Sequence, residues 1–363
     1  MNIVFRVDGS TDIGLGHVMR CLALAKQVNE QHNIIFLCQD LPSQVTTMIA
    51  EAGVTLLLLR NDLSLVNSEN TATGVLSPQI QRHHASKCWS VLVDVLDRNI
   101  DLLVVDHYAL SAPFCSAMRN YCDNIVVIDD LANRSHDCDV LIDQNVYNEF
   151  DTRYEGLLPA HTRTLLGPKY AMLRKEFYQL PTAQRQDNHL IVCFGGSDPD
   201  NLTERTVDIL LALSAEDYTA DIVVGGAYAK VDILKEKLND HPNMVLHHNI
   251  SFLSQLMQRG SFMIGAGGTM HWERARSGIA GLIITLADNQ IETTRCLDEL
   301  NCCVWLGSSD TISDSQIRKA IEFALHSPQN IHDIADNARK LVGEHQSPSF
   351  VMDEILNTIK RNS

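Results

Sequence analysis

The stretch NIVFRVDGSTDIGLGHVMRCLALAK, residues 2 to 26, decides the fold, because an apolar run passes through a glycine-containing turn directly into an amphipathic segment. Residues 3 to 7 predict a buried strand. Apolar residues then recur at helical spacing on one face, at Val18, Cys21, Leu22 and Ala25. The turn from Asp8 to Gly16 is therefore predicted to join a strand to a helix, and loops of this kind line ligand crevices in open α/β sheets.

Two features of this turn indicate a binding or catalytic role. Gly14 and Gly16 lack a Cβ, so the backbone can approach a ligand, and the unpaired N–H groups that start the helix favour an anion. His17 lies in the first helical turn, where the neutral imidazole required of a general base is favoured over the imidazolium. A structural histidine satisfied by local hydrogen bonds is the alternative. The turn lacks GxGxxG spacing, which argues against a nicotinamide enzyme.

Composition narrows the class of protein. The chain has 363 residues, 45% of them hydrophobic, which is enough for two cores. Its net charge of −16, without clustered Lys and Arg, argues against nucleic-acid binding. Ten scattered cysteines without a CxxC pair predict small buried side chains in a reducing compartment. No apolar run approaches the ~20 residues needed to span a bilayer, so we expect a cytoplasmic protein without stable membrane association.

The first half of the chain alternates predicted strands and helices. Further apolar runs at 33–38, 54–59, 102–105 and 125–128 are mostly separated by helical stretches, which predicts a parallel sheet wound with helices. Residues 60 to 86 lack clear periodicity and are rich in Ser, Asn and Thr. We expect this segment to be an excursion outside the sheet.

A second unit of the same type starts near His189, where LIVCFGGSDPDNLTERTVDILLAL repeats the order of strand, glycine turn and helix. Further strands are predicted at 222–224, 244–246, 262–264, 282–285 and 303–306, and helices at 313–325, 331–342 and 350–360. The predicted division is an N-terminal domain 1–180, a linker 181–188, a second domain 189–345 and a C-terminal helix 346–363 that could pack on either domain. The ligand is expected between the domains, at the carboxyl ends of both sheets.

Three polar segments of the second domain are candidate ligand contacts. Gly196 and Ser197 follow the first strand of this domain and form either a ligand loop or a structural turn. Gly267, Gly268 and Thr269 precede a helix that carries Glu273, an arrangement that suits a pyrophosphate on backbone amides with a carboxylate on ribose hydroxyls. In the alternative, Glu273 only complements the helix dipole. Asn289 is expected to contact the sugar or to cap the following helix.

The first domain offers polar strand ends at Asp106–Tyr108 and at Asp129–Asp130, where substrate contacts are expected. Exposed strand ends are polar in many proteins, so a role without ligand contact stays open for each. The DCD segment at 137–139 and the DPD segment at 198–200 resemble a metal-binding DxD. The first enters an apolar run and the second fits a capped turn, so we predict no metal site.

These motifs together resemble the UDP-sugar hydrolases of pseudaminic acid biosynthesis. The resemblance covers most of residues 1 to 300 and rests on DGSTDIGLGHVMRCLALA, VVDHY, VIDDLANRSHDCDVLIDQN, LLGPKYAMLRKEF, FGGSDPDNLT, IGAGG followed by WER, and LADNQ. It implies two Rossmann-like doubly wound domains that face a central cleft, as in glycosyltransferases of the GT-B type. Met270 and His271 depart from the small hydroxyl residues that are more usual there, and the segment 60–100 and the tail after 310 are longer.

The resemblance also implies an activity. The enzyme would hydrolyse UDP-2,4-diacetamido-2,4,6-trideoxy-β-L-altropyranose to UDP and the free sugar by inverting attack of water at the anomeric carbon, without metal or cofactor, in the supply of a nonulosonic acid for flagellin or surface glycosylation. His17 matches the catalytic histidine of the family. The implied substrate contacts are Asp8, Gly14, Gly16, Tyr108, Gly196, Ser197, Gly267, Gly268, Thr269, Glu273 and Asn289.

Two other functions stay open at this point. A glycosyltransferase of the GT-B type would pass the sugar to a lipid or polysaccharide acceptor instead of water. A silent binding protein would hold the nucleotide sugar without turnover, although an intact His17 argues against it.

Overall fold

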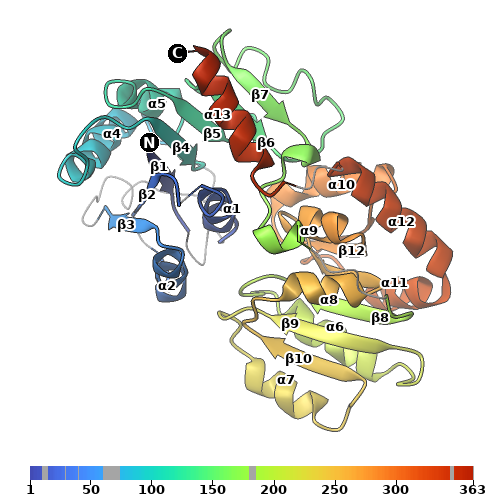
Figure 1. Ribbon diagram of the computed structural model, residues 1–363. Coiled ribbons are helices and arrows are strands. Elements are labelled where there is room, and N and C mark those ends of the chain that lie inside the picture. Colours follow the sequence, from blue (N-terminus) through green and yellow to red (C-terminus); the bar gives the residue numbers. More distant parts are fainter. Residues whose placement is uncertain are drawn as a thin grey trace. The chain divides into compact units, whose positions relative to one another are not determined.

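The computed structural model describes residues 1–9, 15–28, 30–39, 41–59, 74–179, 185–343 and 347–362. The chain forms two compact units (Figure 1). Unit 1 comprises Met1–Asn145, Glu149–Arg174 and Ser347–Ser363, and unit 2 comprises Val146–Asn148 and Lys175–Gln346. Gly14 and the first half of the predicted linker, residues 181 to 184, lie outside the described residues.

Unit 1 is built on a seven-stranded parallel sheet in the order β3-β2-β1-β4-β5-β6-β7. Its strands are β1 Asn2–Val7, β2 Asn33–Cys38, β3 Thr55–Leu58, β4 Leu102–Asp106, β5 Ile125–Ile128, β6 Val140–Asp143 and β7 Arg163–Leu166. The direction of winding reverses between β1 and β4, which pair from Ile3 with Leu102 to Val7 with Asp106. Ligands bind at such reversals in doubly wound sheets, so the loops after β1 and β4 are the expected site.

Alternate side chains of these strands pack on two layers of helices. One face carries Ile3, Phe5 and Val7 of β1 and packs against α1 Gly16–Ala25, α2 Ser43–Glu51 and α13 Phe350–Asn362. The opposite face, which includes Val4, packs against α4 Pro78–Leu92 and α5 Ala112–Met118. Both faces of the parallel sheet are therefore covered, which explains why its strands are continuous apolar runs.

Three segments differ from the sequence-based expectation. Residues 78 to 86 were expected outside the sheet, but they form the first part of α4, where His84 and Ala85 are buried. The strands β6 and β7 were missed, because each has only four residues and no helix separates them from the preceding strand. Residues 60 to 73 of the expected excursion lie outside the described residues.

The C-terminal helix α13 belongs to unit 1, which the sequence left open. Val351, Met352 and Ile355 are buried in the same core as β1, and Arg163 of β7 pairs with Glu354 at 2.6 Å. In Figure 1 this red helix lies beside the green strands β6 and β7. The end of the chain therefore completes the core of unit 1.

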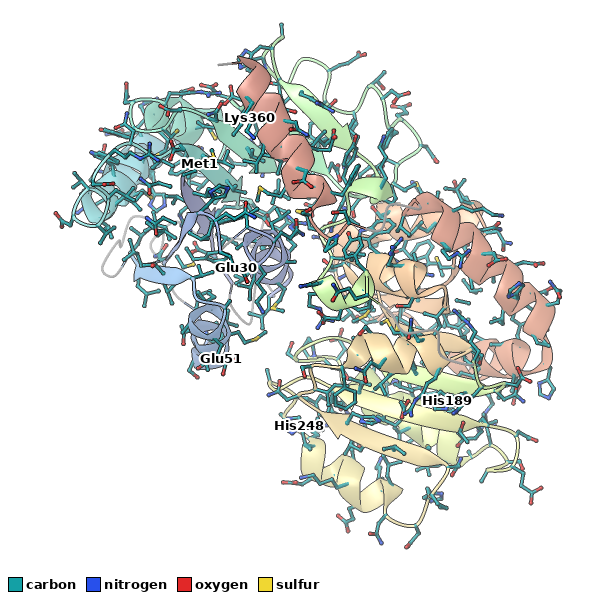
Figure 2. All side chains as sticks on the ribbon, viewed as in Figure 1. Met1, Glu30, Glu51, His189, His248 and Lys360 are labelled. Carbon is teal, nitrogen blue, oxygen red and sulfur yellow. The ribbon has the colours of Figure 1, made fainter. Side chains whose placement is uncertain are left out.

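Unit 2 repeats the same winding on a six-stranded parallel sheet in the order β10-β9-β8-β11-β12-β13. Its strands are β8 His189–Cys193, β9 Thr219–Val224, β10 Met244–His248, β11 Phe262–Ala266, β12 Ala280–Thr285 and β13 Val304–Ser308. Figure 2 labels His189 at the start of the inner strand β8 and His248 at the end of the edge strand β10. Gly265 lies at the reversal, where a Cβ would clash with the Cys193 carbonyl of β8.

Helices cover both faces of this second sheet. They are α6 Leu202–Leu211, α7 Val231–Leu238, α8 Leu253–Arg259, α9 Met270–Ser277, α10 Ile291–Glu299, α11 Asp314–His326 and α12 Pro328–Leu341. The expectation of two Rossmann-like, doubly wound domains is confirmed. In the described part of the chain, no helix is both long and apolar enough to cross a membrane.

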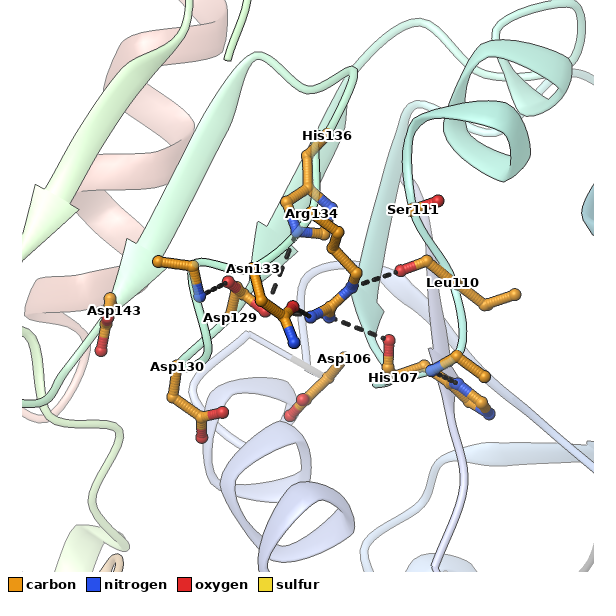
Figure 3. A network of polar contacts seen from close by, with 12 residues as sticks. Asp106, His107, Leu110, Ser111, Asp129, Asp130, Asn133, Arg134, His136 and Asp143 are labelled. Carbon is orange, nitrogen blue, oxygen red and sulfur yellow. Dashed lines mark hydrogen bonds and ion pairs between the residues drawn. The ribbon is translucent and has the colours of Figure 1, made fainter. Parts of the chain in front are cut away.

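A buried polar network holds the loop between β5 and β6 against the loop after β4 (Figure 3). The Asp129 carboxylate accepts from the Ala132 N–H at 2.9 Å and pairs with Arg134 at 2.8 Å. Arg134 donates through Nε to the Leu110 carbonyl at 2.9 Å and through Nη2 to the His107 carbonyl at 3.4 Å. The segment that contains Tyr108 is thereby fixed from both of its flanks.

Asp143, the last residue of β6, lies beside this network and has a pKa above that of an ordinary carboxyl group. Tyr154 lies between two carboxylates, with its hydroxyl 2.9 Å from Asp143 and 3.2 Å from Asp129, and has one proton to give. Burial, together with neighbouring Asp130, raises the pKa of Asp143 to about 7. A protonated Asp143 can donate to the Tyr154 oxygen while Tyr154 donates to Asp129.

This raised pKa predicts that the free energy of unfolding depends on Asp143 in a defined pH window. The native state keeps a proton that the unfolded chain loses near pH ~4, so this contribution to stability is lost as the pH rises from about 4 through about 7. In Asp143→Asn, the side-chain amide can donate to the Tyr154 oxygen as the protonated carboxyl does, but the side chain no longer titrates. Urea denaturation should find this variant more stable than the wild type at pH 8, by about 1–3 kcal/mol, and equal to it near pH 4.

The exposed Asp123 precedes β5, at the amino ends of the strands, and provides the control. Asp123→Asn should leave the dependence of stability on pH as in the wild type. A stability difference for Asp143→Asn that is the same at every pH would contradict the assignment.

Candidate active site

His17 and Asp106 meet at the reversal of the first sheet. His17 belongs to the first turn of α1, Asp106 is the last residue of β4, and the imidazole Nδ1 lies 2.5 Å from the carboxylate Oδ1. Both are buried, His17 with 7% and Asp106 with 1% of its surface exposed. The two residues are brought together because β4 pairs directly with β1, the strand that leads into α1.

The protonation of Asp106 determines which nitrogen of His17 carries the hydrogen. Burial alone would raise the pKa of this carboxyl, but Arg20 and His17 lower it far below its usual range. Asp106 is therefore a carboxylate, which only accepts hydrogen bonds. A lone pair on Nδ1 at this distance would repel the carboxylate oxygen, so Nδ1 carries the proton and Nε2 of the neutral ring has the free lone pair.

The Nε2 atom is available for chemistry. Among the residues that the structure describes, no side chain or backbone group bonds to it. Tyr108 packs with its ring edge-on to His17, at 4.5 Å between centroids and 89° between planes, so the ring has one orientation. An oriented neutral imidazole beside a carboxylate is the arrangement that accepts a proton from water or a hydroxyl group.

Asp8 lies in an adjacent network of its own. Arg6 reaches both carboxylate oxygens at 2.7 Å, and His107 Nε2 lies 2.9 Å from Oδ2. The Ala109 N–H donates to His107 Nδ1 at 3.1 Å, so the proton of the neutral ring is on Nε2 and donates to Asp8. Burial lowers the pKa of His107, which agrees with a neutral ring. A substrate contact by Asp8 stays a prediction, with its carboxylate already held by Arg6 and His107.

The first glycine loop of unit 2 surrounds a carboxylate of the chain itself. Asp198 accepts from the N–H groups of Leu202 and Thr203 at 2.9 and 2.8 Å and thus occupies the amino end of α6. Gly196 is exposed and Ser197 is half-buried beside this turn. Asp198 therefore caps α6 with its side chain. The ligand contacts of Gly196 and Ser197 stay predictions.

The second glycine loop leaves the amino end of α9 without a side-chain cap. Gly268 adopts a positive φ of 77°, and Thr269 precedes α9 without a side-chain cap. Gly267 lies against Gln290, which precedes α10, and Thr294 within α10, and a Cβ would approach these side chains at 3.1 and 3.2 Å. Glu273 is buried in the first turn of α9, with 8% of its surface exposed. The expected pyrophosphate and ribose contacts of these residues stay predictions.

His271, one of the two departures from the family pattern, has a structural part in this loop. Its Nε2 lies 3.0 Å from the Thr294 hydroxyl, which donates to the Gln290 carbonyl at 2.6 Å, and its Nδ1 lies 3.3 Å from Arg274. Burial and Arg274 lower the pKa of His271 well below its usual range, so the ring is neutral. Asn289 is exposed, and α10 begins after Gln290, so Asn289 does not cap that helix.

The DxD segments have partners within the chain. Arg119 pairs with Asp137 at 3.0 Å and with Asp139 at 2.6 Å, and Asp198 caps α6. Within the described ranges, no group of three or more His, Cys, Asp or Glu side chains is arranged to hold a metal ion. All ten cysteines are buried free thiols, as expected from their scatter in the sequence.

The sequence did not reveal the part that two residues have in this candidate site. Asp106 was expected as a polar strand end and is instead the partner of His17. Arg20, which holds the same carboxylate, was not singled out. The available signal was the pair of segments GHVMR and VVDHY. Arg20 follows His17 by one helical turn and Asp106 ends a strand, so the three side chains meet if that strand is the neighbour of β1.

Comparisons with known proteins show distant relatives. No family model matches the chain. An uncharacterized protein of Methanocaldococcus jannaschii is 24% identical over 82% of this chain. The UDP-2,4-diacetamido-2,4,6-trideoxy-β-L-altropyranose hydrolase of Campylobacter jejuni is 26% identical over 56% of it. The alignments span 58% and 63% of these two relatives. The spore coat polysaccharide biosynthesis protein SpsG of Bacillus subtilis is 22% identical over 87% of each chain.

Solved structures resemble the whole chain in fold. MurG of Acinetobacter baumannii has a TM-score of 0.65 at 15% identity, covering 98% of this chain and 100% of its own. UGT2 of Phytolacca americana, solved with UDP-2-fluoro-glucose and pterostilbene, has a TM-score of 0.65 at 10% identity, covering 99% of this chain and 100% of its own. At these identities the likeness shows the fold alone. The chain has a fold of the two-Rossmann, GT-B-like type.

Proposed function

We propose that this protein is a cytoplasmic hydrolase that cleaves UDP-2,4-diacetamido-2,4,6-trideoxy-β-L-altropyranose, a step in pseudaminic acid biosynthesis. The observation that carries the proposal is the His17–Asp106 pair, which leaves the imidazole Nε2 as an oriented base in the loop after β1. The hydrolase of Campylobacter jejuni, at 26% identity, supports the choice of substrate.

The proposed reaction needs one base and a good leaving group. His17 Nε2 takes a proton from water while the water oxygen bonds to the anomeric carbon from the face opposite UDP. The bond between that carbon and the UDP oxygen breaks, so the configuration inverts. UDP leaves as a stable anion and needs no protonated carboxylic acid of the kind used by many glycosidases. A positioned base of this kind contributes about 10²–10⁴ in rate.

Glycosyl transfer is the second candidate. The structural neighbours include glycosyltransferases, and the same Nε2 would deprotonate an acceptor hydroxyl as readily as water. The two reactions differ only in the nucleophile that reaches the anomeric carbon. The fold is common to both, so the distinction depends on product analysis.

The deciding experiment is a reaction in ¹⁸O-water with the UDP-linked sugar, without acceptor and with EDTA. We expect the ¹⁸O label in the free sugar, detected by mass spectrometry, and an inverted anomeric carbon, detected by NMR. Label in UDP would place the attack at phosphorus. Turnover only after addition of an acceptor would establish the transferase and overturn the hydrolase.

His17→Ala should abolish turnover while UDP binding persists, because the variant loses the base but no predicted nucleotide contact. The expected loss of kcat is at least about 10²-fold. His83→Ala, on the exposed face of α4, is the matched control and should behave as the wild type. Isothermal titration with UDP separates the two roles of His17. Equal loss of binding and turnover would indicate a structural histidine.

Gly16→Ala tests the predicted approach of the substrate to the first turn of α1. Gly16 is exposed, and an added Cβ would have no heavy atom of the described residues within 4 Å, so the fold should tolerate it. If the pyrophosphate lies against this backbone, the methyl group should raise KM for the UDP-sugar by about tenfold or more, a cost of ~1.4 kcal/mol. The melting temperature should not fall. An unchanged KM would place the pyrophosphate elsewhere.

A further inference from the structure

Arg20 lies one helical turn after His17 and holds the carboxylate that the histidine needs. Its Nε and Nη2 donate to Oδ2 and Oδ1 of Asp106, each at 2.6 Å, which is a bidentate pair. Its Nη1 reaches Asp130 Oδ2 at 3.2 Å, at the end of β5. Arg20 is buried, with 6% of its surface exposed. It therefore connects α1 to the ends of two strands.

This geometry restricts Asp106 to one orientation. A carboxylate at the end of a strand can rotate, and His17 contacts only its Oδ1. The planar guanidinium contacts both oxygens, so it fixes the carboxylate plane and aims Oδ1 at Nδ1. Removing the arginine would leave a buried carboxylate with the His17 imidazole and the Cys21 thiol as its remaining side-chain partners among the described residues.

The guanidinium also acts on the charge of the histidine. Its Nη2 lies 3.1 Å from His17 Nδ1, and both groups donate to the same oxygen. A carboxylate alone would favour the imidazolium, but the adjacent Arg20 neutralises Asp106 and adds a positive charge next to the ring. An imidazolium cannot accept a proton, so this opposing charge keeps Nε2 usable as a base.

We propose that Arg20 is a positioning residue that aligns Asp106 with His17 and holds the imidazole in its neutral, proton-accepting form. Its effect on catalysis rests on the proposed function, but its effect on the ionisation of His17 does not. Arg20 acts through Asp106 and, by charge, on His17, and it is assigned no contact with the substrate.

The charged groups around His17 make the direction of the effect predictable. In the described part of the chain, the titratable groups nearest the ring or its partners are Arg20 and Cys21 of α1, Asp106 of β4, His107 and Tyr108 after β4, and Asp130 after β5. Burial raises the pKa of Cys21 well above its usual range and lowers the pKa of His107, so both are neutral. The opposing charges are those of Arg20, Asp106 and Asp130.

The test is a titration of His17 by NMR of protein labelled with ¹⁵N in its histidines, without substrate. The His17 signals are assigned by their absence in His17→Gln. In the wild type, they should report a proton on Nδ1 at high pH. In Arg20→Gln, the midpoint of the His17 titration should move up by about one pH unit or more. Arg82→Gln, on the exposed face of α4, is the control and should leave the midpoint unchanged.

Two further variants separate charge from geometry. Asp130→Asn removes a negative charge beyond Arg20, so the midpoint should move down, opposite to Arg20→Gln. Arg20→Lys keeps the positive charge but loses the bidentate contact with Asp106. The midpoint of the His17 titration should therefore stay close to that of the wild type while kcat falls. A merely structural arginine would produce none of these directed shifts. If Arg20→Gln does not fold, the opposite shift in Asp130→Asn decides the question.

The kinetic readout connects this assignment to the proposed reaction. In Arg20→Gln, the acid limb of kcat/KM against pH should move up by the same interval as the NMR midpoint, with activity recovering at higher pH. Unchanged NMR midpoints in folded Arg20→Gln and Asp130→Asn would overturn the role of Arg20. A wild type that turns over no UDP-sugar would instead contradict the proposed function and leave the NMR result to stand on its own.

Discussion

The carboxylate of Asp106 is the group on which the candidate site depends, because it receives a histidine and an arginine from the same helix. A buried carboxylate is stable only when its oxygens are paired and hydrogen-bonded. His17 and Arg20 provide this pairing at 2.5 and 2.6 Å. The same contacts that satisfy Asp106 attach the start of α1 to the end of β4. The stability of the reversal in the sheet and the orientation of the base therefore have one physical origin.

The surrounding networks extend this control to the segment after β4. Asp8 holds His107 from the side of β1, and Arg134 holds the carbonyls of His107 and Leu110 from the side of β5. Tyr108 lies within the segment fixed by these contacts and packs against His17. Charged pairs thus support the site in unit 1. The loop at Gly267 in unit 2 is instead supported by hydrogen bonds that run from the Arg274 guanidinium through the neutral His271 to Thr294.

The comparisons and the site geometry answer different questions. The likeness to MurG and to UGT2 of Phytolacca americana shows how the two sheets are wound. It does not choose between water and another hydroxyl as the nucleophile, because one fold hosts both reactions and the proposed base would serve either. In the proposed reaction the choice depends on which molecule reaches Nε2 of His17. The proposal of hydrolysis rests on the relative in Campylobacter jejuni and on this nitrogen, which has no partner among the described residues.

The sequence by itself determined the fold class and the placement of His17, because strand and helix periodicity and a glycine turn are local properties. Runs such as 33–38 and 125–128 match the observed strands. Tertiary structure decided the rest. The pairing of Arg20 with Asp106 joins residues 86 positions apart and exists only because β1 and β4 are neighbours. Likewise, β6 and β7 are too short for a periodic signal, and the amphipathic pattern of α13 shows that it must be buried but not against which core.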